Sequence, residues 1–234
     1  MGKPGTILIA GIAEGFGLAL AETFAMAGFD IIGLARSERM AAVAGDRVAA
    51  AGRGYRHILA DLRQDAGIRE ALASHARDID GAVVIAQRFL RAPFLETSAE
   101  DFADAFATNC AGAAHVARAL LPAMLEKGQG VLIFAGATAS FRGGAQFSAL
   151  AASKFALRAL AQSLAREFGP QGIHVAHLVI DGAIDTPQTD VRFPGRSSPR
   201  INPMSLARAC LMLARQTPDS FTHELDLRPA GERF

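Results

Sequence analysis

Short apolar runs alternate with longer helical patterns along the whole chain. The runs that we expect to form strands are Thr6–Ala10, Asp30–Ala35, Tyr55–Ala60, Ala82–Ala86, Val131–Ala135, Ile173–Ile180 and Phe221–Asp226. Helical patterns occupy the stretches Gly15–Ala27, Ser37–Ala51, Gln64–Arg77, Ala99–Glu126, Gln146–Phe168 and Met204–Arg215. Parallel strands need a long crossover, usually a helix, so this alternation favours βαβ units. The sequence therefore predicts an α/β fold: one doubly wound domain over residues 1–234, with a parallel sheet of about seven strands and helices on both faces.

Composition excludes several classes of protein. Hydrophobic residues make up 50% of the 234, enough for one large buried sheet, and the net charge of +1 is not that of a nucleic-acid binder. The apolar start Ile7–Ala13 is too short for a signal peptide, and no run reaches membrane-spanning length. Cys110 and Cys210 are the only cysteines, and neither they nor the histidines have metal-site spacing. We expect a cytoplasmic protein with no metal, nucleic-acid or membrane partner.

A turn rich in glycine follows the first expected strand. Gly11, Gly15 and Gly17 are spaced so that the chain can turn tightly and bring its backbone close to a ligand, with Glu14 and Phe16 between them. Exposed N–H groups at the start of the next helix would then face a pyrophosphate. An ordinary strand-to-helix turn is the alternative interpretation of the three glycines.

Further motifs follow in register with this turn. Asn109 lies 45 residues before Lys154, and both fall in expected helices. Together with the glycine turn they resemble the short-chain dehydrogenase/reductase family, and the resemblance runs from Ile7 to about Asp226. It implies a Rossmann-type fold, an NAD(P) cofactor and an oxidoreductase that acts on a carbonyl or alcohol.

The resemblance assigns cofactor contacts along the chain. Asp61 matches the residue that contacts adenine, although it could simply cap the next helix, and Arg36 suits the 2′-phosphate of NADP. Glu14 favours NAD instead, because NADP-binding relatives often carry a basic residue there, so we expect NADP as the preferred cofactor and NAD as the alternative. The full set of expected cofactor-binding residues is Gly11, Glu14, Gly15, Phe16, Gly17, Arg36, Asp61, Leu62, Ala86, Lys154, Gly182, Ile184 and Thr186.

The catalytic positions depart from the family pattern. The family's Tyr-x-x-x-Lys pair is reduced here to Lys154, because Leu150 occupies the tyrosine position and carries no dissociable proton. Ala137 occupies the position of the family's serine, and the only tyrosine, Tyr55, belongs to a different strand. Asn109 and Lys154 remain as catalytic candidates, with Thr138 and Ser148 as substitute donors; further possible donors are Ser140, Asp181 and a water bridged to Lys154.

Two functions stay open on this sequence. The first is an oxidoreductase with a displaced proton donor, for which the long segment 181–203 would form a lid over an unidentified small-molecule substrate. The second is a non-catalytic dinucleotide-binding member that acts as a sensor or partner subunit. The chain also resembles an atypical subgroup of the family that keeps the lysine without the tyrosine. The apolar helices Ala99–Glu126 and Gln146–Phe168 predict a homodimer or homotetramer.

Overall fold

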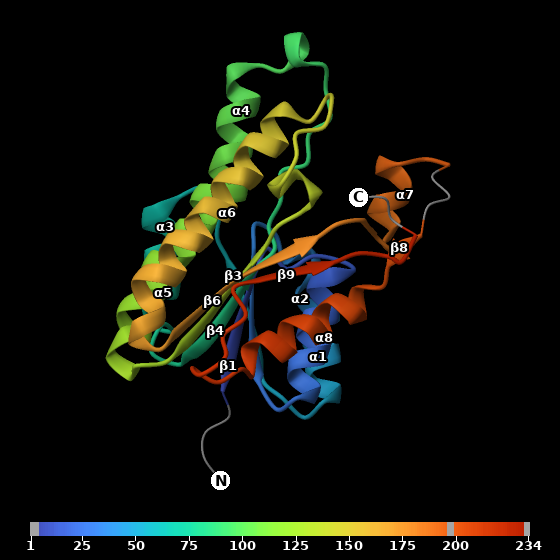
Figure 1. Ribbon diagram of the computed structural model, residues 1–234. Coiled ribbons are helices and arrows are strands. Elements are labelled where there is room, and N and C mark those ends of the chain that lie inside the picture. The colour runs from blue at the N-terminus through green and yellow to red at the C-terminus, as the bar shows by residue number, and fades with distance from the viewer. Residues whose placement is uncertain (1–4, 196–198, 232–234) are drawn as a thin grey trace.

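The computed structural model describes residues 5–195 and 199–231. Its main sheet has seven parallel strands in the order β3-β2-β1-β4-β5-β6-β9 (Figure 1). These strands are β1 (Thr6–Ala10), β2 (Asp30–Ala35), β3 (Tyr55–Leu59), β4 (Ile79–Val84), β5 (Gly130–Ala135), β6 (Ile173–Ile180) and β9 (Glu224–Leu227). The doubly wound Rossmann-type sheet predicted from the sequence is therefore confirmed.

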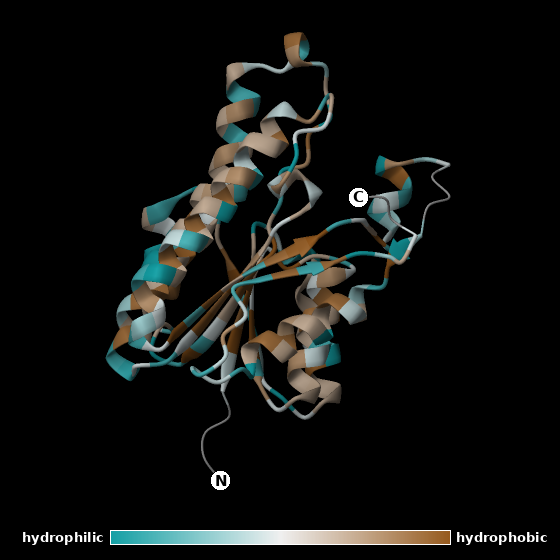
Figure 2. Cartoon of the chain, in the orientation of Figure 1, coloured by the Kyte–Doolittle hydropathy of each residue, from teal (hydrophilic) through white to brown (hydrophobic). Residues whose placement is uncertain are grey.

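Helices cover both faces of the sheet. One face carries α1 (Phe16–Met26), α2 (Ala41–Ala50) and α8 (Pro203–Ala214), and the other carries α3 (Asp65–Leu72), α4 (Ala99–Phe106), α5 (Gly112–Lys127) and α6 (Ser148–Phe168) (Figure 1). The strands and the helix faces that meet them are hydrophobic (Figure 2). Because each strand alternates its side chains between the faces, the apolar strands supply both cores.

Strand order reverses between β1 and β4. β1 pairs with β2 on one side and with β4 on the other, and the crossover helices that follow these strands pack on opposite faces. In open α/β sheets, ligands bind beyond the carboxyl ends of the strands at such a switch point. The fold therefore places the ligand site beside the glycine turn that follows β1.

Several element boundaries differ from the prediction. Predicted strand Ala82–Ala86 is shifted, because β4 begins at Ile79 and the chain leaves the sheet after Val84. The charged residue Asp80 obscured this earlier start in the sequence. Its carboxylate accepts hydrogen bonds from the Thr6 backbone and from Lys127 at the amino ends of the strands. The predicted last strand, Phe221–Asp226, is likewise displaced to β9. Predicted helix Gln64–Arg77 ends at Leu72, where tight turns such as His75 N to Leu72 O replace the helical pattern.

Two segments that the sequence predicted to be continuous contain several separate elements in the structure. The predicted helix Ala99–Glu126 is interrupted by a π-helical turn at Ala107–Ala111, between α4 and α5. The segment 181–203, expected to be irregular, contains the short helix α7 (Pro187–Arg192) and a two-strand pair, β7 (Ala183–Ile184) with β8 (Arg200–Ile201). Thr186 caps α7 by accepting from the Thr189 backbone, and Pro187 suits the first helical turn.

Among the described residues, no helix combines the length and apolar character needed to cross a membrane.

Candidate functional site

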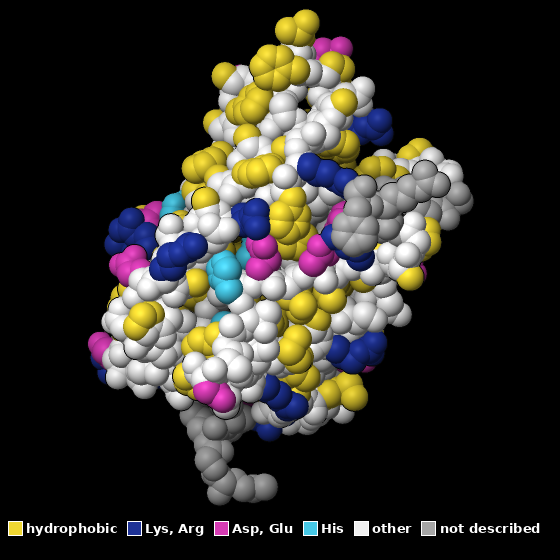
Figure 3. Space-filling view, viewed as in Figure 1, with side chains coloured by type: hydrophobic (Ala, Val, Ile, Leu, Met, Phe, Trp, Pro, Cys, Tyr) yellow, Lys and Arg dark blue, Asp and Glu magenta, His cyan; other side chains and the backbone are white. Residues whose placement is uncertain are grey.

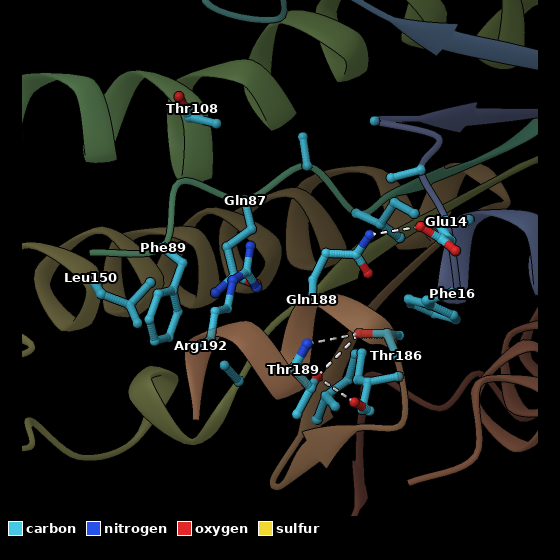
Figure 4. Close-up of a pocket in the computed structure, with 18 of the residues that line it drawn as sticks. Glu14, Phe16, Gln87, Phe89, Thr108, Leu150, Thr186, Gln188, Thr189 and Arg192 are labelled. Atoms are coloured by element: carbon cyan, nitrogen blue, oxygen red, sulfur yellow. Dashed lines mark hydrogen bonds between the residues drawn. The ribbon is translucent and has the colours of Figure 1, made fainter. Parts of the chain in front are cut away.

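A cavity of about 1080 Å³ lies at the carboxyl ends of the strands. Its walls come from the glycine turn after β1, the ends of β2 and β3, the chain after β4 and β5, the start of α6, and residues 180–193 (Figure 4). Pockets that bind small molecules and cofactors typically measure roughly 300–1,000 Å³, so this volume accommodates a large ligand. The position agrees with the switch point of the sheet.

The glycine turn has a backbone that other residues would not tolerate. Gly11 and Gly15 have φ angles of 94° and 79°, in the left-handed region. A Cβ on Gly11 would lie 2.7 Å from Ala86, and one on Gly15 would lie 2.3 Å from the Thr186 methyl carbon. Glycine at these positions therefore leaves a cradle of bare backbone at the start of α1, which fits the pyrophosphate of the expected dinucleotide.

Glu14 links this turn to α7. Its carboxylate accepts from Gln188 Nε2 at 2.9 Å, and Arg39 approaches the same oxygen at 3.9 Å (Figure 4). Both neighbours line the cavity and neither was predicted from the sequence. Glu14, the residue that favoured NAD in the sequence, therefore already forms contacts within the protein.

Basic residues gather where β2 ends. Arg36 and Arg39 both line the cavity, and no carboxylate of the described residues forms an ion pair with Arg36. Nearby Asp61 accepts from the Arg63 guanidinium, and this hydrogen bond holds the pKa of the Asp61 carboxyl below its usual value. Asp61 and Leu62 line the same end of the cavity.

Asn109 is buried in the π-helical turn and does not line the cavity. Its Oδ1 accepts from the Arg88 backbone N at 2.8 Å, and its Nδ2 donates to the Arg88 carbonyl at 3.2 Å and to Ser153 Oγ at 2.8 Å. Single π turns often occur at functional sites, since the extra residue re-aims a side chain. Here it directs the Asn109 amide to the segment that follows β4.

Lys154 and Ser148 also lie outside the cavity lining. Lys154 is 1% exposed, and its Nζ donates to the Ala135 carbonyl at 2.7 Å. Burial lowers the pKa of the Lys154 amine to about 8. The Ser148 hydroxyl is buried and has no hydrogen-bond partner among the described residues. Leu150, by contrast, does line the cavity (Figure 4).

Thr138 offers a hydroxyl at the cavity wall. It follows Ala137 beyond the end of β5, and its Oγ1 donates a short hydrogen bond to Asp181 Oδ1. The Asp181 side chain is buried, and its other carboxylate oxygen lies 3.0 Å from the Arg228 guanidinium. A hydroxyl in contact with both the cavity and an internal carboxylate can pass a proton between them.

Aromatic rings and arginines form the end of the cavity near Leu150. Phe89 packs edge-on against Phe147, at 5.8 Å between ring centroids, and against Phe193, at 5.6 Å. The Arg192 guanidinium lies 5.0 Å from the centroid of the Phe89 ring, in the arrangement drawn in Figure 4. Sequence reasoning missed this group, because its members come from three distant segments that only the fold brings together.

Most of the predicted site residues meet at this one cavity. Those that line it are Gly11, Glu14, Phe16, Gly17, Arg36, Asp61, Leu62, Ala86, Ala137, Thr138, Leu150, Gly182, Ile184 and Thr186. Those that do not are Gly15, Asn109, Ser140, Ser148, Lys154 and Asp181. Tyr55 is also absent from the lining: its hydroxyl is bonded to His57 Nδ1 within β3.

Known proteins resemble this chain over most of its length. The Escherichia coli 3-oxoacyl-(acyl-carrier-protein) reductase is 30% identical over 182 residues, covering 78% of this chain and 74% of the relative. The NADPH-dependent pterin aldehyde reductase of Arabidopsis thaliana is 30% identical over 169 residues, covering 69% and 68%. A short-chain dehydrogenase structure from Rhodopseudomonas palustris, 31% identical, superposes with a TM-score of 0.83 over 97% of this chain and 100% of that one. The model of the short chain dehydrogenase family matches residues 5–196, and the chain therefore belongs to this family.

Proposed function

We propose that this protein is an NADP-dependent oxidoreductase that interconverts a carbonyl and an alcohol through a displaced proton donor. The observation that carries the proposal is the Thr138 hydroxyl, which lines the cavity and is bonded to the buried carboxylate of Asp181. This pair takes over the proton transfer that Leu150 and Ala137 are unable to perform.

The cofactor end of the cavity supports NADP over NAD. Arg36 and Arg39 supply positive charge for a 2′-phosphate. The backbone of Gly11 and Gly17 would receive the pyrophosphate, in a turn that the positive φ of Gly15 helps to shape. One of the relatives above carries NADPH in its name, which agrees with this preference. When bound, NADPH supplies a hydride to the carbonyl carbon.

The proton follows the hydrogen bond from Thr138 to Asp181. In alcohol oxidation, Thr138 Oγ1 accepts the proton of the substrate hydroxyl as it passes its own proton to the Asp181 carboxylate. In carbonyl reduction the same pair would work in reverse: Thr138 Oγ1 would donate a proton to the carbonyl oxygen and take one back by way of Asp181, whose other carboxylate oxygen is paired with Arg228. The proton consumed would be replaced from solvent.

Thr138→Val removes the hydroxyl while keeping the shape of the side chain. We expect it to lower kcat for NADPH-dependent reduction of a dicarbonyl by about 10²-fold, the low end for a positioned general acid, while fluorescence titration gives an unchanged Kd for NADPH. Asp181→Asn should have the same effect, because the amide accepts the hydrogen bond without exchanging a proton. Full activity in Thr138→Val, or a comparable loss in Ser148→Ala alone, would place the proton donor elsewhere.

A second function is favoured by the surroundings of Leu150 and Lys154. An apolar side chain occupies the cavity wall where the family's tyrosine would stand, and the Lys154 amine is bonded to the Ala135 carbonyl instead of facing the cavity. In this alternative, the protein binds the dinucleotide as a sensor or partner subunit and catalyses no reaction. Lys154 would then have to leave Ala135 to bond the ribose of the nicotinamide.

We propose that the segment 181–203 covers the substrate, since Arg192 and Phe193 from it contact Phe89; residues 196–198 lie outside the described residues.

We also propose a homodimer or homotetramer, because Phe106 and Phe155 on the α4–α6 face are 50% and 43% exposed. Hydrophobic side chains gather at this end of the molecule (Figure 3). A monomer by light scattering at micromolar concentration would contradict the assembly.

A further inference from the structure

Positive charge is concentrated inside the cavity of a chain that is almost neutral. Five of the lining residues are arginines and two are acids, although the chain as a whole carries 24 basic and 23 acidic residues. The two acids, Glu14 and Asp61, belong to the dinucleotide end and already contact arginines there. The opposite end holds Arg91, Arg142 and Arg192, with no acid among its described lining residues.

Among the described residues, these three arginines have no counter-charge. Within the described residues, no carboxylate comes within ion-pair distance of Arg91, Arg142 or Arg192; Arg91 Nε is bonded to the neutral Gln146 Oε1 at 2.9 Å. Elsewhere in the protein, arginines such as Arg158 pair closely with acids. Guanidinium groups that share one cavity wall repel each other unless an anion joins them.

Two of the three arginines are held against aromatic rings. Arg192 lies 5.0 Å from the centroid of Phe89, and Arg91 lies 5.9 Å from that of Phe147. A guanidinium on a ring face is attracted by the ring's π electrons and still presents N–H groups to an oxyanion. The same rings, with Leu150, form an apolar surface for the body of a ligand. The cavity wall therefore combines an apolar surface with an anion-binding edge.

We infer that the substrate is an oxyanion with an apolar body. Its carboxylate or phosphate is bound by Arg192, assisted by Arg91 and Arg142, and its aryl or alkyl part lies on Phe89 and Phe147. The inference rests on the proposed function for the reacting group, which is a carbonyl or alcohol on the same molecule. The anion preference itself concerns binding and is measurable without turnover.

The direct test compares an anion with its neutral isostere. Isothermal titration of 3-phenylpropanoate and 3-phenylpropanamide into the protein, with and without saturating NADPH, measures the preference for charge on a constant apolar body. We expect the carboxylate to bind about tenfold more tightly or better, as for hydrogen bonds between charged groups, and the difference to shrink with added salt. A third probe, 3-phenylpropyl phosphate, is compared with 3-phenylpropanoate, and the tighter binder shows whether the site prefers a phosphate or a carboxylate.

Arg192→Gln should remove most of this preference while leaving the Kd of NADPH unchanged. The matched control is Arg77→Gln, which removes the same charge from a side chain that is 82% exposed. Arg77 lies just before β4, at the amino ends of the strands and away from the cavity. Equal affinities for acid and amide, or a preference that survives Arg192→Gln, would overturn the inference. Weaker NADPH binding in Arg192→Gln would also overturn it, by assigning the arginine to the cofactor.

Turnover separates this inference from the proposed function. If a keto acid and its neutral methyl ester are reduced equally well, the oxidoreductase proposal is supported and the anion site is contradicted. If the carboxylate binds selectively and Arg192→Gln abolishes that selectivity, but no carbonyl is reduced, the anion site stands and the oxidoreductase proposal falls.

Discussion

The side-chain amide of Asn109 bonds to both backbone groups of Arg88, accepting from its N–H at 2.8 Å and donating to its carbonyl at 3.2 Å. The chain that leaves β4 is thereby fixed to the π-helical turn between α4 and α5. That segment continues into Phe89 and Arg91 at the cavity. Asn109 thus positions the wall of the site without touching its interior.

Asn109→Ala should destabilise the protein and loosen this wall. The variant leaves the partly buried backbone N–H and carbonyl of Arg88 without their side-chain partner, while the Ser153 hydroxyl keeps its hydrogen bond to the Leu150 carbonyl. An unpaired buried polar group costs about 1–3 kcal/mol, so we expect the free energy of unfolding in urea to fall by about 1 kcal/mol, the low end of that range. The KM for substrate should rise, whereas the Kd of NADPH should change little. Ser153→Ala removes only one of these bonds and serves as the comparison. An unchanged KM in Asn109→Ala would show that Phe89 and Arg91 are positioned by other contacts.

Cofactor choice should depend on Arg36. Arg36→Ala is expected to weaken NADPH binding by about 1.5–3 kcal/mol, the range for hydrogen bonds to charged groups. NADH lacks the 2′-phosphate, so its affinity should stay nearly constant, and parallel fluorescence titrations measure both. The same change at Arg39 tests whether the second arginine shares the phosphate, although that variant also loses the contact with Glu14. Equal losses for both cofactors would mean that Arg36 only shapes the cavity.

The position of the cavity and most of its dinucleotide end could be predicted from the sequence, because they depend on local features. The turn Gly11–Gly17 and the acid Asp61 each follow a strand directly, so their place at the carboxyl edge follows from the parallel sheet. Phe89, Phe147 and Arg192 could not be predicted as a group, since they come from three segments far apart in the sequence and only tertiary packing joins them. The bond between Thr138 and Asp181 spans 43 positions and likewise depends on β5 lying beside β6.

The buried amine of Lys154 should make stability depend on pH in the alkaline range. Its pKa falls from 10.5 to about 8 on folding, so the unfolded chain binds more protons than the native one between these values. Stability contributed by this residue therefore rises as pH increases from 8 to 10.5, by up to about 3 kcal/mol.

Urea unfolding of the native protein and of Lys154→Met, at intervals from pH 7 to 10, isolates this effect. Tyr55, whose pKa burial raises to about 12, acts in the opposite direction above pH 10 but is common to both proteins. The native protein should gain stability relative to Lys154→Met as the pH rises. A constant difference across the range would mean that Lys154 stays charged in the folded state.

The missing hydroxyls can be restored in the double variant Ala137→Ser with Leu150→Tyr. Both positions line the cavity, so the new side chains would face the ligand. A positioned general acid contributes about 10² to 10⁴ in rate, and we expect at least 10²-fold faster NADPH-dependent reduction of a promiscuous dicarbonyl, roughly the lower end of that range. Adding Thr138→Val to this variant should then have little further effect, because the tyrosine supplies the proton.

Thermal unfolding and NADPH titration establish that the variants fold and bind the cofactor. No gain in a folded, cofactor-binding double variant would mean that the cavity has departed from the geometry of hydride transfer, and it would favour the non-catalytic function over the oxidoreductase.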